Sequence, residues 1–141
     1  MGDSNANLPF DVLLQVKIFS DAALKFQQEG KHQEAIPLFA QVTSIIENLP
    51  SKAHDKLVRR VQADAYWNLA TAYLETGNIV KAEFSFNRCL GLKKRKDPSE
   101  LELEVLEKLV QVNELLGKKE LAKNLTKRVE KIRTMLDSRE Q

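Results

Sequence analysis

The chain has 141 residues, of which 43% are hydrophobic and 30% are charged, and its formal net charge is +2. This length suits one domain with its own core, and so small a charge is by itself no argument for nucleic acid or a membrane surface. The single cysteine, Cys89, excludes an internal disulfide framework and is expected to be a small buried residue. No apolar run approaches the length of a bilayer.

The first predicted hairpin of helices covers about residues 11–48, after a flexible tail over residues 1–9. Asp11 or a neighbour is expected to cap the first helix, which ends near a polar turn at Gly30. The second helix follows this turn. Its amphipathic pattern stops before the proline-containing connection that leads to the next hairpin.

Two more hairpins follow, over about residues 56–95 with a turn at Gly77 and over about residues 99–137 with a turn at Gly117. Ser99 and Glu102 have the spacing of a capping box at the start of the fifth helix. Residues 138–141 are expected to form a C-terminal tail. The prediction is therefore one all-α domain over residues 10–137.

The three hairpins share one register, because the same residue types recur at fixed distances from their glycines. Positions eleven, seven and four before each glycine follow the spacing of one helix face. Alanine stands five residues after every glycine, where two helices approach closely: Ala35, Ala82 and Ala122. A recurring unit of a few tens of residues is the signature of stacked repeats, which bury their apolar faces against one another.

The middle unit, residues 65–90, resembles a tetratricopeptide repeat in its order of aromatic, Leu, small, Tyr, Gly, Ala, Phe and small residues. In the first unit Phe19 stands at the hallmark tryptophan position, and in the third Asn113 and Thr126 replace aromatic residues. The glycines lie further apart than the standard period of about 34 residues, which is similar to the extended-helix subgroup found in kinesin light chain-like adaptors. The resemblance implies a right-handed superhelical stack of three antiparallel hairpins that acts as a non-catalytic adaptor.

In such a stack the first helix of each hairpin lines a concave groove, which is expected to hold a peptide or helical segment of a partner protein. Trp67 is the leading anchor, because an indole combines a large apolar surface with one donor; the alternative is that it packs between hairpins. Nearby carboxylates favour a partner with basic and apolar character. The predicted groove row comprises Leu24, Gln28, Trp67, Asn68, Thr71, Leu74, Glu107, Gln111, Glu114 and Leu115.

Some tetratricopeptide proteins grip the acidic C-terminal tail of chaperones with asparagine and basic residues at five positions. The residues at the matching positions here are Ser20, Leu24, Asn68, Glu104 and Lys108. Only Asn68 and Lys108 agree with that pattern, and Glu104 would repel a terminal carboxylate. The chaperone tail is therefore not the expected partner.

Two alternatives to the groove remain open. A basic patch comprises Arg88, Lys93, Lys94, Arg95 and Lys96. Its last four residues resemble a short nuclear-import signal, and the patch would suit an acidic partner such as tubulin or RNA, although basic residues at a helix C-terminus also complement its dipole. The last helix carries a second apolar face that would support self-association as a homo-oligomer. This face consists of Leu121, Leu125, Ile132 and Leu136.

The sequence contains no motif that predicts an enzyme. His32 and His54 lack a second ligand at metal spacing, and the glutamates of the fifth helix have the pattern of a solvated face. No catalytic residue, cofactor or metal is expected, and neither nucleic acid nor membrane insertion is favoured. The expected location is cytoplasmic, with the nucleus as an alternative.

Overall fold

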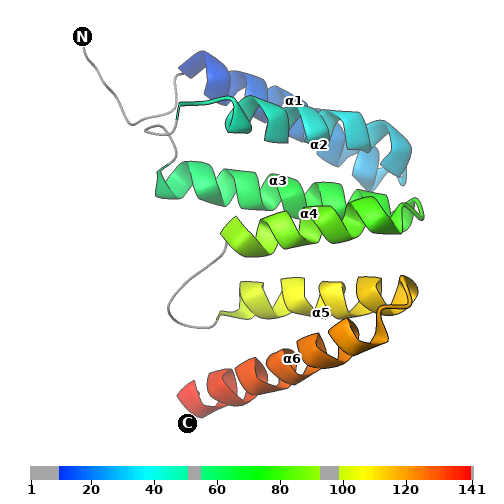
Figure 1. Cartoon of the computed structure of the whole chain (residues 1–141). Coiled ribbons are helices and arrows are strands. Elements are labelled where there is room, and N and C mark those ends of the chain that lie inside the picture. The colour runs from blue at the N-terminus through cyan, green and yellow to red at the C-terminus, as the bar shows by residue number, and fades with distance from the viewer. Residues whose placement is uncertain (1–9, 51–54, 93–98, 141) are drawn as a thin grey trace.

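The computed structural model describes residues 10–50, 55–92 and 99–140. Within these ranges the chain forms six α-helices and no strand. The helices are α1 (Phe10–Gln28), α2 (His32–Glu47), α3 (Lys56–Glu75), α4 (Ile79–Leu92), α5 (Glu100–Leu115) and α6 (Lys119–Arg139). They pair as three antiparallel hairpins that stack as successive layers (Figure 1), and each helix packs mainly against its neighbours in the chain. The predicted all-α stack of hairpins is confirmed.

The starts of the helices follow their capping residues. The side chain of Asp55 accepts a hydrogen bond from the Val58 N–H at 2.9 Å, and Ser99 Oγ accepts one from the Glu102 N–H at 3.2 Å, so Ser99 caps α5 as predicted. Asp11 is not a cap, because α1 already begins at Phe10 and Asp11 lies inside its first turn. Its carboxylate there complements the positive end of the helix dipole.

The turns inside the hairpins depend on a left-handed glycine. Gly77 has φ of 80°, and the adjacent Asn78 N–H donates to the Tyr73 carbonyl at 2.8 Å. A residue with a side chain rarely adopts this conformation, and the bond satisfies a carbonyl that the end of α3 would otherwise leave unpaired. Gly30 and Gly117 have the same geometry, so all three hairpins turn alike.

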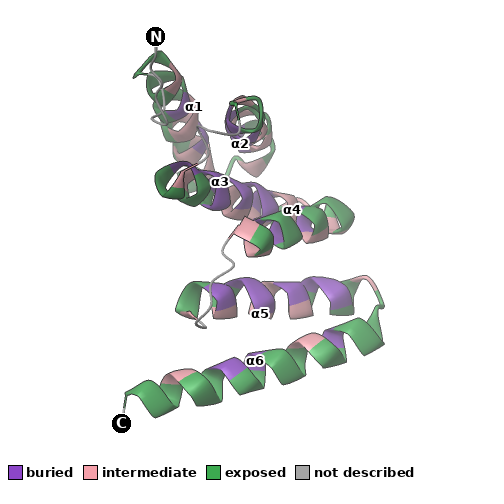
Figure 2. Ribbon diagram, turned by 60° about the vertical axis from the view of Figure 1, so that its left-hand side comes forward, coloured by how far each residue is buried: buried purple, intermediate pink, exposed green. Residues whose placement is uncertain are grey.

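The core runs through the interfaces between helices. Its largest cluster, centred on Phe39, Phe86 and Leu109, spans all three hairpins, and Cys89 is buried within it as predicted. A second cluster joins α1, α2 and α3, and a third joins α5 and α6. Figure 2 shows the consequence: buried residues are most frequent on the inner helices α3 and α5, whereas α1 and α6 at the two ends of the stack are mostly exposed.

Candidate functional site

Two adjacent aromatic residues on α3 have different surroundings. Tyr66 is only 4% exposed, whereas Trp67 is partly buried and its ring meets Phe86 edge-to-face at 5.4 Å between centroids. The indole N–H of Trp67 has no hydrogen-bond partner among the described residues. Tyr66 therefore fills the packing position, and Trp67 combines a contact with the core and a surface open to solvent.

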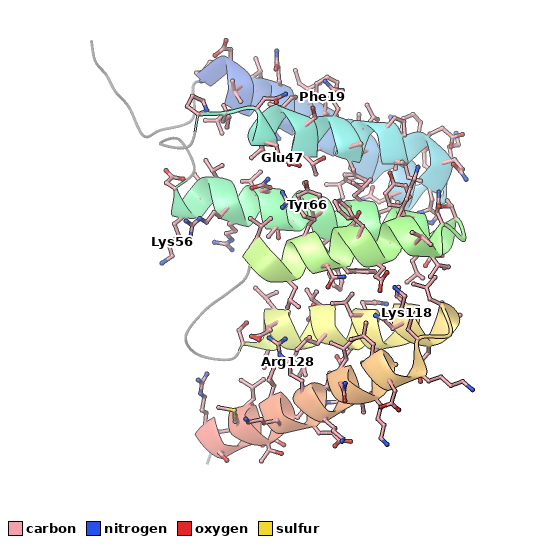
Figure 3. The ribbon with its side chains drawn as sticks, in the orientation of Figure 1. Phe19, Glu47, Lys56, Tyr66, Lys118 and Arg128 are labelled. Carbon is pink, nitrogen blue, oxygen red and sulfur yellow. The ribbon has the colours of Figure 1, made fainter. Side chains whose placement is uncertain are left out.

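Tyr66 is held by a polar network that joins three helices. Its hydroxyl donates to Glu47 on α2, and Arg88 on α4 binds the other oxygen of Glu47 at 3.2 Å. The Arg88 guanidinium also lies 5.3 Å from the centre of the Tyr66 ring, within range of a cation–π contact. Figure 3 shows Glu47 and Tyr66 on the facing sides of α2 and α3. Desolvation by burial, reinforced by the hydrogen bond to Glu47, raises the pKa of Tyr66.

The predicted groove row divides between buried and exposed side chains. Leu24, Trp67 and Leu74 all pack against the central core cluster from α1 and α3. On α5, Leu115 is 59% exposed. Of the other residues of the row, Asn68, Thr71 and Glu107 are half-buried, and Gln28, Gln111 and Glu114 are exposed. The Thr71 hydroxyl donates to the Trp67 carbonyl at 2.9 Å, which occupies its donor.

Glu107 lies toward α6, where it forms an ion pair with Arg133. Together they line a pocket of about 300 Å³ between α5 and α6. The remaining lining residues are Glu100, Leu103, Glu104, Leu136, Asp137 and Glu140. The sequence did not predict this pocket, because its acidic residues have the spacing of a solvated face. Glu102 also departs from that expectation, since it is buried and pairs with Arg128 at 3.4 Å.

The predicted basic patch is only partly visible. Lys93, Lys94, Arg95 and Lys96 lie outside the described residues, and Arg88 is engaged with Glu47. A basic row that the structure does show runs along α6 at intervals of four residues, with every member exposed and no ion pair to another described residue. We call it the α6 lysine row: Lys119, Lys123, Lys127 and Lys131.

The apolar face of the last helix is covered by its own hairpin. Ile132 is buried against α5, and Leu125 and Leu136 pack around the same cluster. Only Leu121 of the four predicted residues is exposed. The alternative of self-association through this face thus loses most of the surface that it requires.

No group of three or more His, Cys, Asp or Glu side chains in the described residues is arranged to hold a metal ion. None of the described helices combines the length and the apolar character that crossing a membrane requires.

Comparison with known proteins agrees with this architecture. Residues 63–96 match the tetratricopeptide repeat family model, which covers most of α3, all of α4 and the turn at Gly77. No match is found among curated proteins. The predicted resemblance is therefore confirmed in sequence for the middle hairpin.

Solved structures with a similar fold include two of nearly identical TPR-like repeats from a candidate kinesin light chain of Podosopora anserina. One, of a form with a single substitution, has 22% sequence identity and a TM-score of 0.66 over 85% of this chain and 55% of that chain. The other has 22% identity and a TM-score of 0.64 over 85% of this chain and 56% of that chain. The chain thus spans about half the length of these structures and has their tetratricopeptide-type fold.

Proposed function

We propose that the chain is a non-catalytic adaptor that binds a peptide or helical segment of a partner protein along the exposed sides of α1, α3 and α5. The observation that carries this proposal is the partly exposed Trp67. Tyr66 already joins α2, α3 and α4, so the neighbouring indole is not needed for that junction. Rigid aromatic anchors of this kind dominate many interfaces.

The surroundings of Trp67 support a partner with both apolar and basic groups. Leu74 on the same helix is half-buried, and Leu115 on α5 adds an exposed apolar side chain. Asp64 on α3 and Gln111 on α5 are exposed polar neighbours in the same two helices. Apolar anchors beside carboxylates would complement an amphipathic segment that carries lysine or arginine. A cytoplasmic or nuclear setting, and the absence of catalysis, are parts of the same proposal.

The experiment uses Trp67 as its own probe, because it is the one tryptophan of the chain. Peptides are first selected from a displayed random library, and the best binder is then titrated into the protein while tryptophan emission is recorded. Binding beside the indole should shift the emission to the blue and protect it from acrylamide. We also expect selected peptides to combine basic and apolar residues.

Matched variants locate the contact. Leu115→Ala should lower the affinity for the peptide about tenfold, as truncation of an interface anchor does. Val80→Ala removes a similarly exposed apolar side chain from α4 and should leave affinity unchanged. Trp67→Phe keeps an aromatic ring against Phe86 and should also weaken binding. Peptides that bind Leu115→Ala and the original chain equally, without changing the emission of Trp67, would show the proposal to be wrong.

The α6 lysine row favours a second candidate function, capture of an acidic partner. Its four ammonium groups are exposed on the outer helix of the stack, and a run of unpaired cations attracts polyanions. A polyglutamate peptide should then bind the original chain more weakly as salt is added. Lys123→Glu with Lys127→Glu should abolish that binding and leave the peptides selected above unaffected.

A further inference from the structure

The outer face of α1 has an exposed apolar centre. The equivalent positions on α3 and α5 are buried. Twelve residues before the glycine stands Ile18 in α1, Ala65 in α3 and Val105 in α5. Ala65 and Val105 are 5% and 1% exposed, and Ile18 is 56% exposed. Ala65 packs in a cluster with residues of α2, and Val105 in a cluster with residues of α4. In the second and third hairpins, the face that corresponds to the one around Ile18 packs against the preceding hairpin.

The residues around Ile18 are arranged so that the face complements itself. Leu14 precedes Ile18 by four residues and Ala22 follows it by four, while Asp11 precedes it by seven and Lys25 follows it by seven. All five lie on one side of a helix, because these spacings correspond to whole turns. Neither Asp11 nor Lys25 has an ion-pair partner in the described part of the chain.

We propose that two copies of this chain associate through the outer faces of their α1 helices, which cross antiparallel about Ile18. In this arrangement Ile18 meets Ile18 of the second copy and Leu14 meets Ala22. Asp11 meets Lys25 at both ends, about 10 Å along the helix from the centre. A parallel arrangement would instead place Asp11 against Asp11 and Lys25 against Lys25. The antiparallel pair has the two-fold symmetry that is most common in homodimers.

The opposite end of the stack does not offer a competing surface for head-to-tail growth. Thirteen residues after the glycine, α2 has the buried Thr43 and α4 has Leu90, which packs against the cluster of α5 and α6. The equivalent residue of α6 is the exposed Glu130. The charged Glu130 at this position opposes the stacking of a further apolar face, so association should end with two chains.

The first experiment measures the molar mass of the full chain by sedimentation equilibrium. The concentration series reaches about 100 µM, where a micromolar dissociation constant gives mainly dimer. Ile18→Glu places two carboxylates against each other at the two-fold axis and should raise the dissociation constant at least about tenfold. Phe84→Glu is the matched control, because Phe84 is also an exposed apolar residue, on α4, and it should leave the mass distribution unchanged.

The second experiment exchanges charges across the axis. Asp11→Lys makes both ends of the face positive, and Lys25→Asp makes both ends negative, so each variant alone should be a single chain. Mixed in equal amounts, the two variants should form a heterodimer. In that pair the lysines of one chain face the aspartates of the other at both ends of the crossing. Circular dichroism of each variant checks that the helices are retained.

Four results would overturn the proposal. The first is that the original chain remains monomeric at the highest concentration. The second is that Ile18→Glu and Phe84→Glu both give the same mass as the original chain. The third is that the charge variants do not combine when mixed. Growth beyond two chains would also overturn it, because it would indicate head-to-tail contact.

Discussion

The two junctions between hairpins are built differently. The junction of α2 with α3 has an apolar cluster that contains Val42, Ile46 and Val58, and it has the Tyr66 network in addition. The junction of α4 with α5 has less contact. Its apolar residues join the cluster around Phe86, and its polar link in the described residues is the pair of the exposed Lys118 with the half-buried Glu83.

This difference indicates that the stack does not hold its layers equally. In a repeat protein each unit contacts only its neighbours, so stability is roughly the sum of unit and interface contributions. The hairpin behind the weaker junction should therefore open at lower free energy than the rest. We expect α5 and α6 to separate from the stack before the first two hairpins do.

The largest effect should come from truncating the core at each junction. Leu109→Ala and Ile46→Ala remove fully buried side chains, and each should cost about 2–5 kcal/mol. Leu109→Ala should accelerate the hydrogen exchange of amides in α5 and α6 alone, whereas Ile46→Ala should accelerate that of amides in α1 to α3. Equal acceleration of all six helices by both variants would mean that the junctions are energetically alike.

The Tyr66 network should contribute the next largest effect. Tyr66→Phe leaves the ring in place but removes the hydrogen bond to Glu47, and should cost about 1–2 kcal/mol in urea unfolding. The pKa of Tyr66 is raised in the folded chain, so its contribution is complete below the unfolded value of 10.0 and is lost as pH rises through the folded pKa.

The pH dependence provides the control for this variant. Above the unfolded pKa of tyrosine the unfolded chain has lost the proton that folded Tyr66 retains, so the original chain loses stability there. Tyr66→Phe does not lose stability in this way, so the difference in the free energy of unfolding between the two proteins should shrink at alkaline pH. A difference that is constant across that range would contradict the assigned role of the hydroxyl.

A smaller effect of opposite sign is expected at Asn113. This residue is 1% exposed, and its Oδ1 has no hydrogen-bond partner in the described part of the chain, although its Nδ2 donates to the Leu109 carbonyl at 2.7 Å. Leucine has the same branching and no polar atoms to satisfy, so Asn113→Leu should stabilise the chain by about 1 kcal/mol. It should also slow exchange in α5 and α6. Gln111→Leu, at an exposed site of the same helix, is the control and should give no gain.

The smallest effect should come from the polar link at the second junction. Lys118 Nζ contacts Glu83 at 3.0 Å, but the lysine side chain is 49% exposed. Exposed ion pairs contribute little, so Lys118→Ala should cost less than about 0.5 kcal/mol, and added salt should erase the difference. A cost above about 1 kcal/mol would mean that this pair, and not apolar packing, holds the third hairpin.

Local sequence was sufficient to predict the helices and their turns. The left-handed glycines and the cap at Ser99 act through neighbouring residues, so they can be recognised in the sequence alone. The helices of the structure consequently begin and end within a few residues of their predicted bounds. The sequence also predicted that the helices pair as hairpins, because alanines and aromatic residues recur at the same distances from each glycine.

The contacts between layers were less accessible to prediction. Glu47, Tyr66 and Arg88 come from three different helices, and their meeting depends on how the hairpins are rotated against one another. Glu107 has the spacing of a groove residue, yet it lies near Arg133 because α6 packs on that side of α5. Periodicity places a side chain on a face of its helix, but the neighbour of that face is decided by the stack.

The edge that carries the three glycine turns is suited to the attachment of labels. The turns lie together along one edge of the stack, and the first residue of α1 and the last of α6 lie along the other (Figure 1). A Cβ atom built on Gly30, Gly77 or Gly117 would meet no other atom within 4 Å. Because the positive φ disfavours replacing these glycines, fluorescent labels or short tags placed beside them would project from the edge opposite the ends of α1 and α6.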